Sequence, residues 1–162
     1  MLITRHGTKA YANGKSDTYQ FDPPLTLTGI DNASTLGLSL LDANIDEILT
    51  SPYYRCIQTA LAIQRVLKQF GRDISVKIEP LLAEYLGNQK VVREADLRLD
   101  AWLSYPGVET IKDLRIRVKK FTQRYPVVTT RKLIVTHGLV IRQLLEWNVV
   151  DIEETTVYQA MR

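Results

Sequence analysis

The chain has 162 residues, about the length of one domain, since domains usually run to roughly 100–200 residues. Hydrophobic residues make up 45% and charged residues 24%, a balance that excludes a largely disordered chain. No apolar run approaches the roughly 20 residues of a membrane span, and no signal-peptide pattern is visible, so we expect no membrane partner and a cytoplasmic location. The net charge of +3 suits anionic substrates without indicating nucleic acid.

The counts of cysteine and histidine limit the metal chemistry that can be expected. Cys56 is the single cysteine, which excludes an internal disulfide and a cysteine-based zinc site. We expect it to be a small buried residue rather than a nucleophile. His6 and His137 are the only histidines, so a histidine-rich metal site is not expected either. The sequence therefore predicts a protein that works without a metal or another cofactor.

The first quarter of the chain predicts a strand, a loop and a helix. Residues 2–4 form a short apolar stretch that is typical of a first strand. Residues 8–25 contain glycine, asparagine, aspartate and two prolines, the composition of a loop. Apolar residues then recur every three or four positions, and Thr26 is a good cap, so we expect a helix over residues 27–42.

The next segment repeats the alternation of strand and helix. Residues 47–50 predict a second strand. Ser51 is a favoured N-cap and Pro52 suits the first helical position, so a helix is expected to begin there. That helix should end at Gly71, because glycine commonly terminates helices. Alternating apolar residues over 74–78 predict a third strand.

The second half of the chain begins with an irregular segment at residues 81–108 and continues with regular elements. A helix is expected over 109–124, a buried strand over 131–136 and a helix over 139–147. The tail is ambiguous, and residues 155–160 are consistent with an edge strand. The basic residues of the 109–124 helix are expected on its solvated outer face: Lys112, Arg115, Arg117, Lys119 and Lys120.

Strands that alternate with helices imply a three-layer α/β/α sandwich around a mainly parallel sheet. Because no repeat or linker interrupts the pattern, we predict one domain over residues 1–162. In such sheets, ligands bind at the carboxyl ends of the strands. Several polar residues lie just after predicted strands: Arg5, His6, Ser51, Arg55, Glu84 and His137. Separate segments thus deliver polar side chains to one edge of the sheet, which predicts a functional site there.

These residue types suit the handling of a phosphoryl group. An imidazole attacks phosphorus only when it is neutral, and an ordinary histidine is partly neutral near pH 7. The planar fork of arginine donates two hydrogen bonds to a phosphate at once, so Arg5 and Arg55 are candidate clamps. Arg55 also falls in a first helical turn, where free N–H groups favour an anion. His137 can add a further donor, and no metal is needed.

The order and spacing of these elements resemble the histidine phosphatase superfamily, also called the phosphoglycerate-mutase-like fold. The resemblance spans about residues 2–147 and rests on Arg-His-Gly at 5–7, Asp-Pro-Pro-Leu-Thr-Leu-Thr-Gly at 22–29, Ser-Pro-x-x-Arg-x-x-x-Thr-Ala at 51–60 and Val-Thr-His-Gly at 135–138. It implies that His6 is the phosphorylated nucleophile. It also implies that Arg5, Arg55 and His137 form the phosphate pocket.

The resemblance also suggests which residue supplies the proton to the leaving group. Family members commonly place an acid in a Leu-x-Glu context after the third strand, and Leu82-Ala83-Glu84 matches that position. Glu84 is therefore the candidate general acid, and later the general base for water. The Gly-x-x-Glu-Gly continuation of the mutases is missing after Gly87, which disfavours a mutase. Contributions from Thr8 and Asn13 in the first loop are left open.

The sequence favours a histidine acid phosphatase-like phosphomonoesterase. The insert at residues 85–105 is short, so we expect a rather open pocket for a phosphorylated small molecule or a phosphoprotein. Three alternatives stay open: a phosphoglycerate-mutase-type phosphotransferase, a protein phosphohistidine phosphatase and a non-catalytic phospho-ligand-binding module. Compact phosphohistidine phosphatases of the family commonly lack a matching acid, so a functional Glu84 favours phosphate monoesters. The oligomeric state and the physiological substrate are not predicted.

Overall fold

A computed structural model of the protein describes residues 1–11, 22–85, 109–126, 131–146 and 152–159. Most of the predicted first loop, Asn13 included, lies outside the described residues, as does the insert beyond Tyr85. Within the described residues, no helix is long and apolar enough to cross a membrane.

Five strands form one mostly parallel sheet. They are β1 (Leu2–Arg5), β2 (Glu47–Thr50), β3 (Ser75–Ile78), β4 (Lys132–Thr136) and β5 (Val157–Gln159). The order across the sheet is β3-β2-β4-β1-β5, and only β5 runs antiparallel, as an edge strand beside β1. In the register, Arg5 faces Thr136 and Thr50 faces Val135, so β1, β2 and β4 end side by side. The edge strand that the tail suggested is therefore present.

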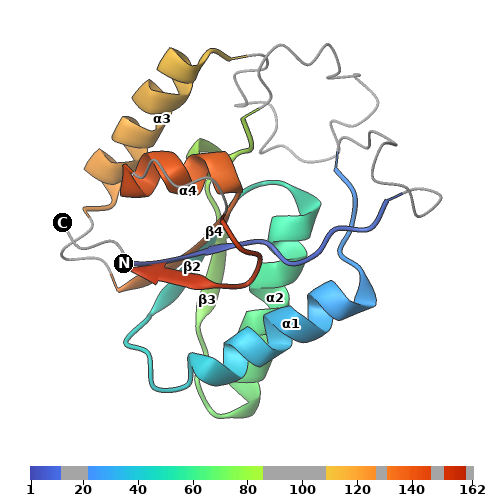
Figure 1. Ribbon diagram of the computed structural model, residues 1–162. Coiled ribbons are helices and arrows are strands. Elements are labelled where there is room, and N and C mark those ends of the chain that lie inside the picture. Colours follow the sequence, from blue (N-terminus) through green and yellow to red (C-terminus); the bar gives the residue numbers. More distant parts are fainter. Residues whose placement is uncertain (12–21, 86–108, 127–130, 147–151, 160–162) are drawn as a thin grey trace.

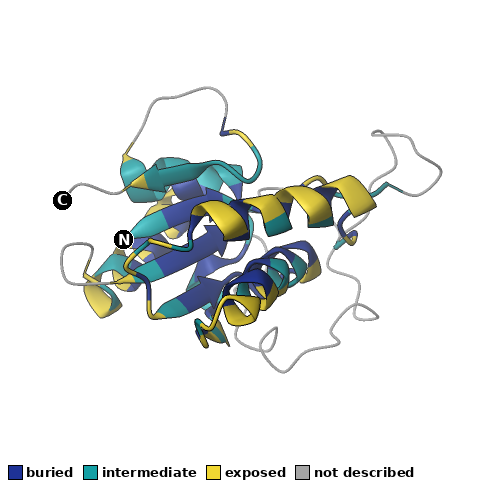
Figure 2. Cartoon of the chain, turned by 90° about the horizontal axis from the view of Figure 1, so that it is seen from below, coloured by how far each residue is buried: buried dark blue, intermediate teal, exposed yellow. Residues whose placement is uncertain are grey.

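The helices cover both faces of this sheet, and the three-layer α/β/α architecture is confirmed (Figure 1). The helices are α1 (Leu27–Ser39), α2 (Tyr54–Gln69), α3 (Ile111–Arg124) and α4 (Gly138–Leu145), with a short 3₁₀ turn, η2 (Pro80–Leu82). Helices α1 and α2 pack together on one face, and α3 and α4 on the other. Figure 2 shows the resulting contrast between buried strands and exposed outer faces of the helices.

The strands are buried on both faces because successive side chains point in opposite directions. In β2, Ile48 packs into the core under α1 and α2, whereas Leu49 packs into the core under α3 and α4. In β4, Leu133 likewise packs into the core under α1 and α2, and Ile134 into the core under α3 and α4. All four side chains are fully buried. Continuous apolar runs such as Leu-Ile-Val in β4 are what a parallel sheet between two helical layers requires.

Helix α2 does not begin where the sequence predicted. Its first residue is Tyr54, and the Ser51 hydroxyl does not cap it. The Asp22 carboxylate accepts hydrogen bonds from the Tyr54 N–H at 2.8 and 2.9 Å instead. Asp22 is distant in sequence, so a local capping rule could not identify it. The helix ends before Gly71, as expected, and Gly71 has a positive φ of 81°.

Helix α3 starts with a capping box between Thr110 and Asp113. The prediction that Arg117 lies on its solvated face is wrong. Arg117 is buried and forms an ion pair with Glu109, which is buried as well. A buried cation is tolerated only when charged and polar groups surround it. The exposed positions Arg115 and Lys120 of the same helix agree with the prediction.

Two glycines permit a close approach of backbones beside His6. A Cβ atom on Gly7 would lie 2.6 Å from the Gly29 carbonyl oxygen. A Cβ atom on Gly29 would lie 2.4 Å from the carbonyl oxygen of Thr8. The loop after β1 is thereby held against the start of α1, where Thr26 caps the helix and also bonds to Thr8. This contact explains why both sequence motifs end in glycine.

We predict that Gly29→Ala lowers the free energy of unfolding by about 1–3 kcal/mol, the usual effect of overpacking. The added methyl group would meet backbone atoms that have no room to move. Urea denaturation measures the change. Gly138→Ala is the matched control, because Gly138 is also helical and the nearest atom to an added Cβ there is 3.9 Å away. Equal stability of the two variants would contradict this account of the close approach.

Candidate active site

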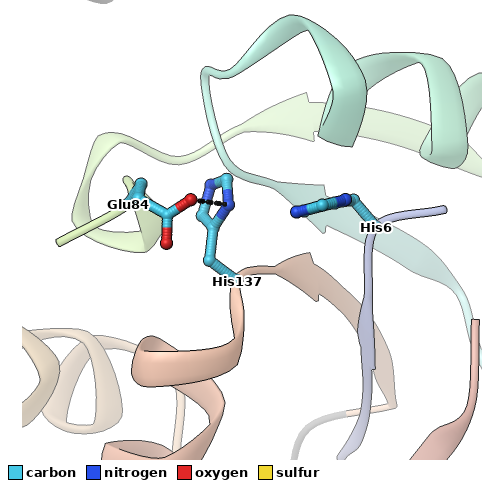
Figure 3. A group of neighbouring side chains, drawn as sticks. All are labelled: His6, Glu84 and His137. Carbon is cyan, nitrogen blue, oxygen red and sulfur yellow. Dashed lines mark ion pairs between the residues drawn. The ribbon is translucent and has the colours of Figure 1, made fainter. Parts of the chain in front are cut away.

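The structure brings together four of the five predicted site residues. His6 follows β1, Arg55 lies in the first turn of α2, Glu84 follows η2 and His137 lies between β4 and α4. Because the strands end side by side, these segments meet at one edge of the sheet. In Figure 3, His6 points toward His137, and Glu84 lies on the other side of His137, with its ion pair to the ring drawn as a dashed line.

Arg55 connects the other three residues. Its Nε lies 3.3 Å from His6 Nε2, and its Nη2 lies 2.6 Å from Glu84 Oε2 and 3.3 Å from His137 Nδ1. Its Nη1 donates to Asp22 at 3.3 Å. Only 3% of Arg55 is exposed. The guanidinium therefore carries a buried positive charge at the centre of the site.

The hydrogen bonds of His6 determine which of its ring nitrogens keeps an unprotonated lone pair. Nδ1 lies 2.8 Å from the carbonyl oxygen of Gly7, and a carbonyl only accepts hydrogen bonds, so Nδ1 carries the proton. Nε2 then keeps its lone pair and accepts the hydrogen bond from Arg55. Burial, together with His137 and Arg55, lowers the pKa of His6 well below its ordinary value of 6.5. His6 is therefore neutral at pH 7.

His137 is oriented by a partner on each ring nitrogen. Nε2 lies 2.8 Å from the Ser51 hydroxyl, and Nδ1 lies 3.0 Å from Glu84 Oε2. With the proton on Nδ1, the ring donates to the carboxylate and accepts from Ser51. Burial lowers the pKa of His137 to about 4; Glu84 opposes this shift, and Arg55 adds to it. The ring is thus neutral at pH 7 and presents a fixed tautomer.

Glu84 is ionised at neutral pH. Burial disfavours its carboxylate form, but His137 and Arg55 stabilise that form more strongly and hold its pKa well below the usual range. Arg55 and His137 both contact the same carboxylate oxygen, Oε2. The sequence predicts that Glu84 donates a proton, so the group must first gain one. This requirement is not visible in the sequence.

Arg5 is less closely connected to the other predicted residues. Its Nη1 donates to the carbonyl oxygen of Ile152 at 2.8 Å. Its Nε is buried and has no hydrogen-bond partner within the described part of the chain. Thr8, whose role was left open, donates to Glu154 at 2.6 Å. The segment that carries Ile152 and Glu154 thus lies beside the end of β1, which the sequence did not suggest.

Three residues that position the site were not predicted in these roles. Asp22 binds both Arg55 and the start of α2. The Thr59 hydroxyl accepts from the Gly7 N–H at 3.1 Å and donates to the Arg55 carbonyl. The Tyr53 ring lies under the Arg55 guanidinium at 4.5 Å and against His137. Asp22 and Thr59 belong to the motifs at residues 22–29 and 51–60, and this membership was the sequence signal that could have indicated their roles.

Cys56 matches its prediction as a small buried residue. It is fully buried, and its sulfur lies 3.5 Å from His137 Nε2. Burial raises the pKa of this thiol, so the reactive thiolate does not form at neutral pH.

The site also contains a set of groups that could bind a metal ion. His6, Glu84 and His137 place one ligand atom each within 4.8 Å of one another. However, Arg55 contacts all three groups, and its charge would oppose a cation at the same place. A positively charged group between two neutral imidazoles instead favours an anion.

We predict that neither histidine titrates near pH 6.5. In an NMR titration, His137 should gain a proton near pH 4, and His6 well below pH 6.5. The free energy of unfolding should fall as the pH drops from 6.5 toward 4, because the unfolded chain then binds protons that the native rings do not. Each single His→Asn variant leaves one ring signal for assignment. A midpoint at or above 6.5 for either ring would contradict the buried neutral site.

Comparisons with known proteins identify the family and the fold of this chain. An ecdysteroid-phosphate phosphatase of Drosophila melanogaster is 33% identical over 119 residues, which cover 66% of this chain and 15% of that protein. Bacillus stearothermophilus YhfR has a similar structure, with a TM-score of 0.68, 23% identity and coverage of 96% of this chain and 87% of that chain.

A mycobacterial glucosyl-3-phosphoglycerate phosphatase, solved with VO3, has a TM-score of 0.66 at 18% identity and covers 97% of this chain and 88% of that chain. At these identities the two structures support the fold alone. Residues 1–159 match the sequence model of the histidine phosphatase superfamily, branch 1. The chain therefore belongs to the histidine phosphatase superfamily.

Proposed function

We propose that this protein is a metal-independent phosphatase that hydrolyses phosphate monoesters through a phosphohistidine on His6. One observation carries the proposal: the unprotonated Nε2 of a neutral, buried His6 lies 3.3 Å from the Arg55 guanidinium. A nucleophile needs its lone pair, and a phosphoryl group needs a cation beside it. Here the lone pair of His6 Nε2 and the positive charge of Arg55 lie side by side.

The phosphate pocket consists of donors that are already oriented. Arg55 is held between carboxylates and imidazoles and presents a planar fork that suits phosphoryl oxygens. Arg5 would contribute its buried Nε, which has no other partner within the described residues. His137, with its orientation set by Ser51, would donate to a further oxygen once Glu84 releases it. These roles of Arg5, Arg55 and His137 are part of the proposal.

In the first step, His6 Nε2 attacks phosphorus and the bond to the ester oxygen breaks. The phosphoryl group moves to His6, and the leaving oxygen takes a proton from Glu84 and departs as an alcohol. In the second step, Glu84 removes a proton from water, which attacks the phosphohistidine. This releases inorganic phosphate and restores both residues, so one group serves first as acid and then as base.

Substrate binding supplies the protonation that this sequence of steps requires. A phosphate that binds Arg55 competes with Glu84 for the same donors and adds negative charge beside the carboxylate. Both effects raise the pKa of Glu84 from the low value that His137 and Arg55 maintain. Glu84 then accepts a proton from a monoanionic substrate or from solvent.

The comparisons support a phosphate ester as the substrate class. The Drosophila relative is named for a phosphorylated steroid, and the mycobacterial neighbour for a phosphorylated sugar derivative. We propose a phosphorylated small molecule rather than a phosphohistidine protein, because an acid in the position of Glu84 matters when the leaving group is an alcohol. The segments at 12–21 and 86–108 lie outside the described residues, so the substrate is proposed only at this level.

We predict that the protein hydrolyses para-nitrophenyl phosphate in the presence of EDTA, and that His6→Asn abolishes this activity. The side chain of Asn cannot form the phosphoenzyme, although it preserves polarity near Gly7. Release of nitrophenol measures the rate, and circular dichroism checks the fold of the variant. Activity that EDTA removes and Zn²⁺ restores would contradict the proposal and favour a metal bound by His6, Glu84 and His137.

We predict that Glu84→Gln slows hydrolysis of an alkyl phosphate about 100-fold, the lower end of the usual contribution of general acid–base catalysis. Dinitrophenyl phosphate should be affected far less, because its leaving group departs without a proton. The comparison of kcat/KM for the two substrates is the measurement, because kcat also includes hydrolysis of the phosphohistidine, a step in which Glu84 acts as the base for both substrates. Glu47→Gln is the matched control, since Glu47 lies at the opposite end of β2 and pairs with Lys132. Equal losses for both substrates would show that Glu84 does not protonate the leaving group.

A further inference from the structure

The proton donor of the proposed reaction lies just after a turn whose backbone is tied to a distant helix. Glu84 follows η2, and the carbonyl oxygens of the three residues before Glu84 each accept a side-chain hydrogen bond. Arg117 Nη1 donates to the carbonyls of Leu81 at 2.7 Å and Ala83 at 2.9 Å, and the Thr136 hydroxyl donates to that of Leu82 at 2.7 Å. The backbone on the amino-terminal side of Glu84 is therefore fixed by side chains from α3 and β4.

Arg117 is itself held in place by Glu109. Its Nε donates to Glu109 Oε2 at 3.0 Å, and its Nη2 pairs with the other carboxylate oxygen. Both residues are buried, with 6% of Arg117 and 4% of Glu109 exposed. A bidentate pair of this kind fixes the plane of the guanidinium, so Nη1 has one direction in which to donate.

We propose that the Arg117–Glu109 pair positions Glu84 for proton transfer, an inference that rests on the function proposed above. Arg117 is a positioning residue rather than a catalytic one, because it contacts the backbone before Glu84 and not the reacting atoms. It lies outside every motif by which the sequence resembles its family. The pair links α3 to the site residue that follows η2.

The chemistry of arginine makes the role specific. Arg117 serves four acceptors with three nitrogens: two carboxylate oxygens and two carbonyl oxygens. An ammonium group is a single point with three hydrogens and a shorter reach, so lysine at this position could keep the charge but not all four contacts. Arg117→Lys should therefore loosen the turn and leave the charge of the core unchanged.

The test compares Arg117→Lys with Arg115→Lys, the same substitution at an exposed position of the same helix. We expect Arg117→Lys to lower kcat/KM for an alkyl phosphate about tenfold more than kcat/KM for dinitrophenyl phosphate, within the roughly 100-fold that a displacement of about 1 Å can cause. Arg115→Lys should leave both rates unchanged. In a Glu84→Gln background, Arg117→Lys should cause no further selective loss.

Each other result overturns the inference. Equal losses for the two substrates would assign Arg117 a purely structural role, as would a selective loss that persists without Glu84. If Arg117→Lys does not fold, Glu109→Gln tests the same pair, because it weakens the anchor that directs Arg117 Nη1 toward the turn; it must show the same selective loss. His6-dependent hydrolysis by the wild type reports separately on the proposed function. Failure of the positioning role therefore leaves the phosphatase proposal intact.

Discussion

The structure of the site depends on one buried positive charge. Removing a guanidinium from water is unfavourable unless its donors and its charge are both matched. Around Arg55, the acceptors come from three separate parts of the chain: Asp22 before α1, His6 after β1 and Glu84 after η2, and His137 after β4 lies beside the guanidinium. The parallel sheet makes this possible because three of its strands end at the same level. Substitutions at Arg55 should consequently disturb the site as a whole.

The same charge links the protonation states of the other groups. Arg55 adds to the lowering of the pKa of both imidazoles by burial, and it helps to keep Glu84 ionised. The site thus contains a neutral nucleophile and an ionised carboxylate that must gain a proton before it can act as an acid. A bound phosphate would raise the pKa of Glu84, so that the carboxylate gains a proton. The binding of the substrate therefore also prepares Glu84 to donate a proton.

The sequence predicted the sheet, the helices and the site to different degrees. Periodicity and end signals located the strands and the four helices, because both depend on local patterning. Family motifs identified His6, Arg55 and His137, which the structure brings together. The start of α2 was misplaced because its cap is Asp22, a contact across the fold rather than a local one. Arg117 was assigned to a solvated face because its partners, Glu109 and the turn before Glu84, are brought to it only by packing.

The most direct test of the central claim is to trap the phosphoenzyme. Rapid mixing with a labelled phosphate ester, followed by quenching in base, preserves a phosphohistidine, and peptide mass spectrometry locates it. We predict a phosphoryl group on His6 that forms and decays at rates compatible with turnover. We also predict that the His6→Asn variant carries no label while it remains folded. Label on His137, or turnover without any phosphoenzyme, would contradict the account.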